Sequence, residues 1–175
     1  YIPLGHTDVF GLLQDNLSFE LVKEWFSDLW KKEDLFWIFH NAKFDLHVLC
    51  REFSFTSIPE KIGDTLIAAW MLSPGSHVLS LDEQVRIELN HVMIPIADLI
   101  GRGKSQIPFT QVSVEKASEY GAEDAVYTLR LWNKLFPKLQ EAGYEKFFFQ
   151  MEMPLLKVLL EMEQTGIALD KQKMQ

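Results

Sequence analysis

The stretch "FHNAKFDLHVL" (residues 39–49) places an aspartate inside a run that otherwise has the pattern of a buried segment. Asp45 has Phe44 and Leu46 on either side, and the strongly apolar "LFWIF" (35–39) comes just before this helix-like run. The apolar pentapeptide predicts a strand that is buried on both faces, as in a parallel sheet. A carboxylate in this setting has no obvious solvent face, so it needs either a structural partner or a function.

The residues after the strand predict a helix that continues to about Phe53, with Asn41 able to cap its N-terminus. Apolar residues at helical spacing predict further helices at about residues 18–32, 64–71, 80–89, 113–135 and 144–163. Ser18 is the expected N-cap of the first of these, Pro137 is expected to end the longest, and Pro154 marks a kink or restart. The opening "YIPLGH" looks like the end of a strand. A buried strand that runs straight into a helix predicts an α/β domain.

Composition and charge narrow the class of protein. The chain has 175 residues, of which 47% are hydrophobic, enough for one domain and part of another. Its apolar runs are far shorter than the roughly 20 residues of a membrane span, so we expect a soluble, cytoplasmic protein without a membrane partner. The net charge of −8 argues against a broad basic surface for nucleic acid. It leaves room for an enzyme that handles a nucleic-acid end through bound metal.

Asn41 and Asp45 are four residues apart at the start of the predicted helix, so they share one helix face. Ligands of open α/β sheets bind at the carboxyl ends of the strands, and this helix begins at such an end. Asp45 is therefore expected to face a cleft. The alternative is that Asp45 only complements the positive end of the helix dipole from the first turn.

A second stretch, "ASEYGAEDAVYTL" (117–129), repeats this arrangement. Tyr120 and Asp124 are four apart on one predicted helix. Gly121 and the nearby alanines have small side chains, so a substrate or another backbone can approach this helix face closely. Two aspartates on two helices, one with a tyrosine a turn away, suit metal-assisted phosphodiester hydrolysis, because hard divalent cations take oxygen ligands. The alternative is a helix whose Tyr and Asp are half-exposed and whose alanines pack.

The motifs have a family resemblance. "HNAKFD" (40–45) and "YGAED" (120–124) resemble the second and third motifs of the 3′-5′ proofreading exonuclease domain of bacterial DNA polymerase I, a family A polymerase. "GDTLIAAWMLSPG", "LSLDEQV" and "IADLIGRGKSQIPF" resemble the intervening segments in the same order. "MEMPLLKVLLEMEQTGIALD" (151–170) resembles the junction at which the polymerase domain begins. The resemblance covers essentially the whole chain.

The resemblance implies a ribonuclease H-like α/β fold and removal of the 3′-terminal nucleotide of single-stranded DNA with two Mg²⁺ or Mn²⁺ ions. Asp45 and Asp124 are then the metal-binding carboxylates, and Tyr120 positions the attacking water. The substrate contacts implied next to the second motif are Asn41, His40 and Phe44.

The same resemblance implies the domain organisation. Residues 1–140 are the expected exonuclease domain and residues 141–175 the start of the polymerase domain, so the rest of a polymerase chain is the expected partner in cis. The last helix is expected to belong to this following domain, so some of its apolar side chains should lack their full set of packing partners. These residues are Phe147, Phe148, Leu155, Val158 and Leu159.

One part of the family pattern is missing. The first motif, an Asp-x-Glu on the first strand, supplies further metal ligands, and no such motif occurs at the corresponding place. The chain is therefore interpreted as a fragment without the first strands of the fold, and the isolated chain is predicted to be inactive. The alternatives are a stand-alone exonuclease of the ribonuclease D type and a decayed, non-catalytic domain of a family A polymerase. The polymerase-like junction argues against the first, and the retained Asn41, Asp45, Tyr120 and Asp124 argue against the second.

Overall fold

The fold combines helices with a small parallel sheet, as expected for an α/β protein. The computed structural model describes residues 1–170 and 172–173, so residues 171, 174 and 175 of the expected polymerase segment lie outside the described part. The α-helices are α1 (Phe19–Trp30), α2 (Ala42–Phe53), α3 (Thr65–Leu72), α4 (Leu81–Leu89), α5 (Ile96–Ile100), α6 (Val114–Glu141), α7 (Glu145–Phe147) and α8 (Met153–Thr165). Short 3₁₀ turns cover Gly103–Ser105 and Phe109–Gln111, and a π-helical segment covers Phe148–Glu152. None of the described helices is long and apolar enough to cross a membrane.

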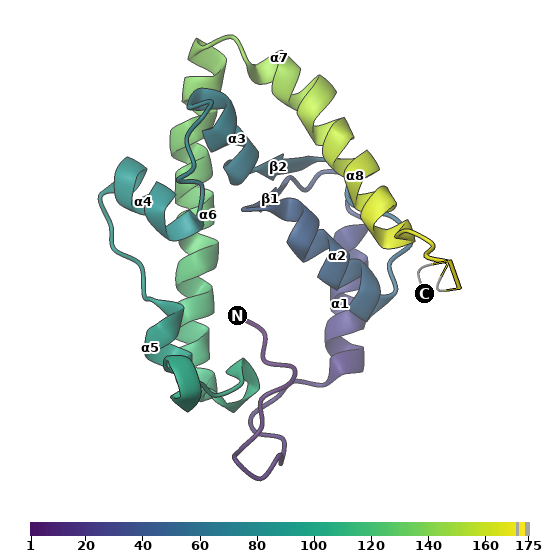
Figure 1. The fold of residues 1–175 in the computed structure, drawn as a ribbon, viewed down its shortest axis with the longest axis vertical. Helices are drawn as coiled ribbons and strands as arrows, with labels where there is room; N and C mark the ends of the chain where they lie inside the picture. Colours follow the sequence, from purple (N-terminus) through teal and green to yellow (C-terminus); the bar gives the residue numbers. More distant parts are fainter. Residues whose placement is uncertain (171, 174–175) are drawn as a thin grey trace.

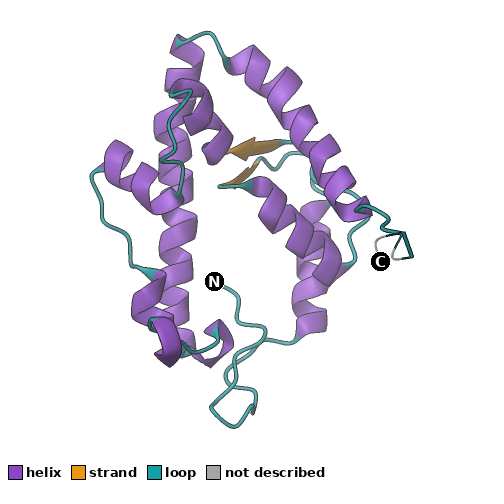
Figure 2. Ribbon diagram, in the orientation of Figure 1, coloured by secondary structure: helices purple, strands orange, loops and turns teal. Residues whose placement is uncertain are grey.

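Two short strands, β1 (Trp37–Phe39) and β2 (Ile62–Asp64), form the sheet (Figure 2). They pair in parallel, so both strands end at the same edge, where α2 and α3 begin. Complete burial of residues 35–39 was a wrong prediction, because β1 has only three residues and each is partly exposed. The expected strand end at residues 1–6 was also wrong, since an isolated antiparallel bridge between Thr7 and Leu13 is the β-structure nearby.

The helices lie on both sides of this sheet (Figure 1). Helix α6 runs along one side with α3, α4 and α5 beside it, while α1, α2 and α8 lie on the other. The ring of Trp132 in α6 packs against Gly63 of β2, where a Cβ atom would come within 2.8 Å of the ring. A glycine at this position therefore lets the long helix approach the sheet closely.

Pro137 does not end α6, contrary to the prediction, because the helix continues to Glu141. Proline removes one helical hydrogen bond and crowds the preceding turn. The turns on either side of it carry Leu135 and Leu139, which are 1% and 0% exposed in the core. Burial of these side chains stabilises the helical path beyond the proline.

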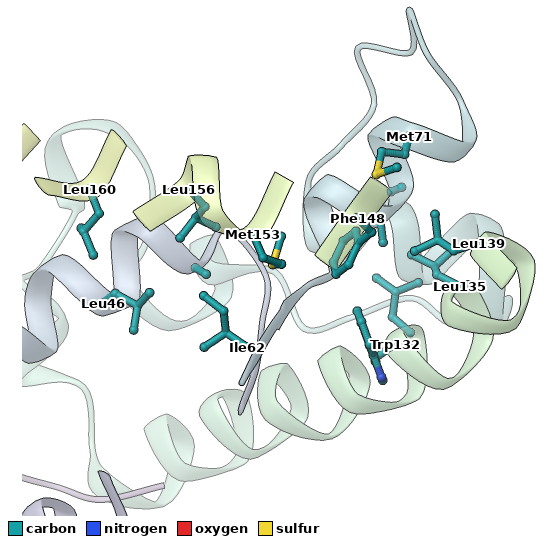
Figure 3. Packing of buried hydrophobic residues seen from close by; sticks show 14 of the residues in the cluster. Leu46, Ile62, Met71, Trp132, Leu135, Leu139, Phe148, Met153, Leu156 and Leu160 are labelled. Atoms are coloured by element: carbon teal, nitrogen blue, oxygen red, sulfur yellow. The ribbon is translucent and has the colours of Figure 1, made fainter. Parts of the chain in front are cut away.

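The C-terminal helical segment, residues 145–165, buries some of its apolar side chains in the core and exposes others. Phe148, Met153, Leu156 and Leu160 are buried against residues of α2, β2 and α6 (Figure 3), so the prediction that Phe148 lacks partners was wrong. The other four residues of that prediction, Phe147, Leu155, Val158 and Leu159, are all at least 36% exposed. The π-helical segment ends at Glu152, two residues before Pro154, whose missing N–H fits a local change of hydrogen-bond register.

Candidate active site

The site is organised by a buried aspartate that the sequence analysis did not single out. Asp64, the last residue of β2, is 2% exposed. Its carboxylate accepts hydrogen bonds from the backbone N–H groups of Asn41 (3.1 Å) and Ala42 (2.8 Å) at the start of α2. It also accepts from Leu66 (2.8 Å) and Ile67 (3.4 Å) at the start of α3. One carboxylate therefore caps both helices that begin at the carboxyl edge of the sheet.

Asn41 holds the N-cap position of α2, but its side chain makes no capping hydrogen bond. The prediction that Asn41 caps the helix was wrong, because the carboxylate of Asp64 performs this task. Asn41 has a left-handed backbone conformation (φ 66°, ψ 57°), which asparagine tolerates better than most residues. Its exposed side chain is consequently free of any structural role in the cap.

Asp45, in the first turn of α2, is half-buried and lies near other acids. Burial is the largest cause that raises its pKa, to about 6, and the negative charges of Asp64 and Asp124 add to the rise. Asp45 and Asp124 are 79 positions apart in the chain, so their electrostatic interaction depends on how α2 and α6 meet.

Tyr120 and Asp124 occupy successive turns of α6. Burial raises the pKa of Asp124, and a hydrogen-bonding interaction with the Tyr120 hydroxyl partly offsets that rise. The pKa of Tyr120 is raised too, first by burial and then by the charge of Asp124. The exposed carboxylate of Asp82 on α4 raises both pKa values further. A strongly negative potential therefore surrounds this part of α6.

Tyr120 and Asp124 line a pocket of about 410 Å³, which we call the α4–α6 pocket. Its remaining lining residues come from α4 and from residues 92–96, as follows: Leu81, Asp82, Glu83, Arg86, Val92, Met93, Ile94, Pro95 and Ile96. Asn41 and Phe44 instead line a second hollow of about 590 Å³, the α2–α8 groove, together with Lys43, His47, Val48, Arg51 and Glu163. The structure thus places Tyr120 and Asp124 in one hollow and Asn41 and Phe44 in the other, whereas Asp45 and His40 line neither of them.

His40 follows β1 directly and is held by two hydrogen-bonding contacts inside the protein. Its Nδ1 lies 2.8 Å from the Thr65 hydroxyl, and its Nε2 lies 2.9 Å from the carbonyl oxygen of Leu79. Burial lowers its pKa, with partial compensation from the charge of Asp64. The imidazole therefore ties the end of β1 to α3 and to the segment before α4.

Comparison with known protein families matches residues 7–140 to a family described as 3′-5′ exonuclease. The chain belongs to this 3′-5′ exonuclease family. DNA polymerase I of Rhizobium leguminosarum is 31% identical over 98% of the chain, and that of Treponema pallidum is 35% identical over 93%. DNA polymerase I of Chloroflexus aurantiacus is 41% identical over 76% of the chain. The resemblance inferred from the motifs is therefore confirmed.

The exonuclease chain spans only a small part of these relatives, namely 17%, 16% and 14% of their respective lengths. The family match ends at residue 140, whereas the match to the Rhizobium polymerase covers 98% of the chain. Similarity to DNA polymerase I therefore extends over most of the chain and beyond the part that matches the exonuclease family.

The exonuclease also contains a positioning residue that the sequence analysis missed. Glu123, next to Asp124, accepts hydrogen bonds from the His91 side chain (2.8 Å) and from the backbone N–H of Ile94 (2.7 Å). The His91 ring in turn stacks on Tyr127, with 4.1 Å between ring centroids. These contacts hold residues 90–95, here called the connector loop, against α6. Residues 92–95 of the connector loop line the α4–α6 pocket. Glu123 lies within the third motif, "YGAED" (120–124), and this position was the available clue.

Proposed function

We propose that this chain is the catalytic region of a proofreading exonuclease within a DNA polymerase I. The reaction is hydrolysis of the 3′-terminal phosphodiester of single-stranded DNA, with release of a nucleoside monophosphate. Membership of the 3′-5′ exonuclease family supports the reaction class. The observation that carries the site assignment is that Asp45 and Asp124, on the separate helices α2 and α6, are both partly buried acids whose pKa values are raised mainly by burial, with the charge of Asp124 making the smallest contribution to the rise at Asp45.

Asp45 and Asp124 are the proposed metal ligands. Their carboxylate oxygens are the donors that Mg²⁺ and Mn²⁺ prefer, and the repulsion between them is relieved when cations bind. Metal ions in such a site stabilise negative charge on the attacking and leaving oxygens. Among the described residues, no group of three or more His, Cys, Asp or Glu is gathered for metal binding. The two carboxylates thus offer the oxygen donors that these ions prefer. Two carboxylates alone are too few, so the ions need further ligands.

The other proposed roles follow from position. The Tyr120 hydroxyl, beside the Asp124 carboxylate, orients the water that attacks the terminal phosphodiester. The exposed side chains of Asn41 and Phe44 contact the 3′-terminal nucleotide, and Phe44 offers a ring on which a base can stack. His40 supports this contact through the end of β1, because both of its ring nitrogens already have partners in the protein.

The proposed architecture is the ribonuclease H-like exonuclease fold over residues 1–140, followed by the start of a polymerase domain at 141–175. The end of the family match at residue 140 and the longer match to a DNA polymerase I support this division. The exposed side chains of Phe147, Leu155, Val158 and Leu159 also support it, because they suit contact with the rest of a polymerase chain. The proposed DNA substrate supports a cytoplasmic location.

The proposal is tested with a longer DNA polymerase that carries this chain. A 3′-labelled single strand should lose its terminal nucleotide in the presence of Mg²⁺ or Mn²⁺. Asp45→Ala and Asp124→Ala should each abolish this release while primer extension continues. The isolated 175-residue chain should show no detectable release, because two carboxylates cannot hold two divalent ions in the geometry that in-line attack requires. Full exonuclease activity in both variants would refute the site assignment.

A further inference from the structure

The α2–α8 groove carries a line of basic side chains that the proposed hydrolysis does not use. Lys43, His47 and Arg51 recur at every fourth position of α2 and all line the groove. They therefore lie on one face of the helix, spread over about 12 Å along its axis. In a chain with a net charge of −8, three basic side chains on one helix face stand out, and Arg51 also forms an ion pair with the neighbouring Glu52 (2.7 Å).

The groove is continuous with the residues proposed to hold the 3′-terminal nucleotide. Asn41 and Phe44, at the N-terminal end of α2, line the same hollow as the basic side chains. The Phe44 side chain is 67% exposed. An exposed aromatic ring at one end of a basic groove is the combination by which proteins bind single-stranded nucleic acid without reading its sequence.

One acid occupies this otherwise basic groove. Glu163 of α8 forms an ion pair with Lys43, and it is the one acid among the described lining residues. The two side chains are 52% and 32% exposed, so the pair is accessible to solvent and its contribution to stability is small. A carboxylate held this weakly is easily replaced by another anion.

We propose that the α2–α8 groove binds the phosphates of single-stranded DNA that leads to the active site, and that Glu163 holds one phosphate position in the free protein. Lys43 then exchanges the Glu163 carboxylate for a DNA phosphate, while His47 and Arg51 continue the contact along α2. This inference rests on the proposed exonuclease function, because the terminal nucleotide fixes which end of the groove the strand approaches. Single-stranded DNA is favoured over an apolar partner because most of the lining residues carry polar or charged side chains, and the exposed Phe44 ring suits stacking of a base.

The test exploits opposite effects of removing the two partners of one ion pair. Binding of a labelled oligothymidylate is measured by fluorescence anisotropy in EDTA, so that hydrolysis plays no part. Lys43→Gln should weaken binding severalfold and reduce the slope of log K against log salt concentration by about 0.7. Glu163→Gln should tighten binding by up to about fivefold, because Lys43 no longer has to leave a carboxylate. Arg51 is exposed and pairs with Glu52 outside the groove lining, and Arg51→Gln should weaken binding in the same direction as Lys43→Gln.

The matched control is a second Lys–Glu pair that joins two helices away from the groove. Lys138 on α6 pairs with Glu88 on α4 at 2.5 Å. Lys138→Gln and Glu88→Gln should change oligothymidylate binding by less than twofold each. If Lys43→Gln and Glu163→Gln change binding in the same direction, or no more than this control pair, the ion pair is only structural and the inference is wrong. Failure of the unsubstituted chain to bind the oligonucleotide would also overturn it.

The same variants in a longer polymerase separate this inference from the proposed function. The opposite effects should persist there, and their disappearance would show that other protein segments cover the groove, which would overturn the inference. If release of the terminal nucleotide requires Asp45 and Asp124 but Lys43→Gln leaves oligonucleotide binding unchanged, the exonuclease assignment stands and the groove assignment fails. If binding shows the opposite effects while release does not depend on those aspartates, the groove assignment stands and the hydrolytic site lies elsewhere.

Discussion

Replacement of Asp64 by alanine should destabilise the chain more than removal of either proposed metal ligand. The Asp64 carboxylate is almost fully buried and accepts backbone hydrogen bonds from the first turns of α2 and α3. Asp64→Ala leaves N–H groups at two helix N-termini without acceptors, in a place that water does not reach easily. The two helices would lose their common anchor on the sheet.

The expected magnitude follows from two helix caps lost at once. Loss of one N-cap side chain typically costs about 0.5–2 kcal/mol, and buried, charge-assisted caps lie toward the upper end of that range. Asp64→Ala should therefore lower the free energy of unfolding by about 3–4 kcal/mol. Asp64→Asn keeps the shape and one acceptor oxygen, so it should lower the free energy of unfolding by about half as much.

Urea unfolding followed by far-UV circular dichroism measures these changes. Asp34→Ala is the control, because Asp34 is an exposed aspartate in the segment before β1. A loss for Asp64→Ala within about 1 kcal/mol of the loss for Asp34→Ala would refute the double-cap explanation. Carbon NMR of the Asp45 carboxyl gives a second measurement. Its pKa should fall in Asp64→Asn, because the charge of Asp64 is the second-largest cause of its rise.

Three further predictions concern the active site and the sheet. Asp45→Asn should stabilise the metal-free chain above pH 6 by about 1–3 kcal/mol, because the Asp45 pKa rises from 3.8 to about 6 on folding. This gain should vanish below pH 3.8, and urea titrations that show the same gain at every pH would contradict it. Glu123→Gln should accelerate hydrogen exchange of the connector-loop amide that now donates to the Glu123 carboxylate, measured by NMR, while exchange in α1 stays unchanged. Gly63→Ala should cost about 1–3 kcal/mol in urea unfolding because its Cβ would meet the Trp132 ring, whereas Gly5→Ala, with open space around it, should cost much less.

The helices of this fold were largely predictable because their causes are local. Apolar spacing placed α1, and Ser18 at its N-cap accepts a hydrogen bond from the Leu21 backbone as predicted. Ser80 likewise precedes α4, although its side chain makes no cap hydrogen bond. The motif residues on α2 and α6 were placed on helices for the same reason. Helical periodicity thus located the elements that carry the proposed site.

The features that were missed depend on contacts between distant segments. Strand β2 has three residues, too few for a periodic pattern, and it is recognisable as a strand by its pairing with β1. The double-cap role of Asp64 needs that same parallel register, which brings the start of α2 next to the start of α3. Pro137 signals a helix end locally, but the burial of Leu135 and Leu139 overrides that signal. A single sequence contains none of these long-range contacts explicitly.

The acids near the sheet edge differ in how their charges are compensated, and this difference separates structural from functional carboxylates. Asp64 is the most buried of them, yet four backbone N–H groups solvate its charge. Asp45 and Asp124 are less buried, but burial and neighbouring acids raise their pKa values. A fold has no structural reason to hold two such acids near each other, because their repulsion lowers its stability. Binding of cations would remove that repulsion, so the same arrangement that weakens the metal-free protein favours the metal-dependent function proposed for it.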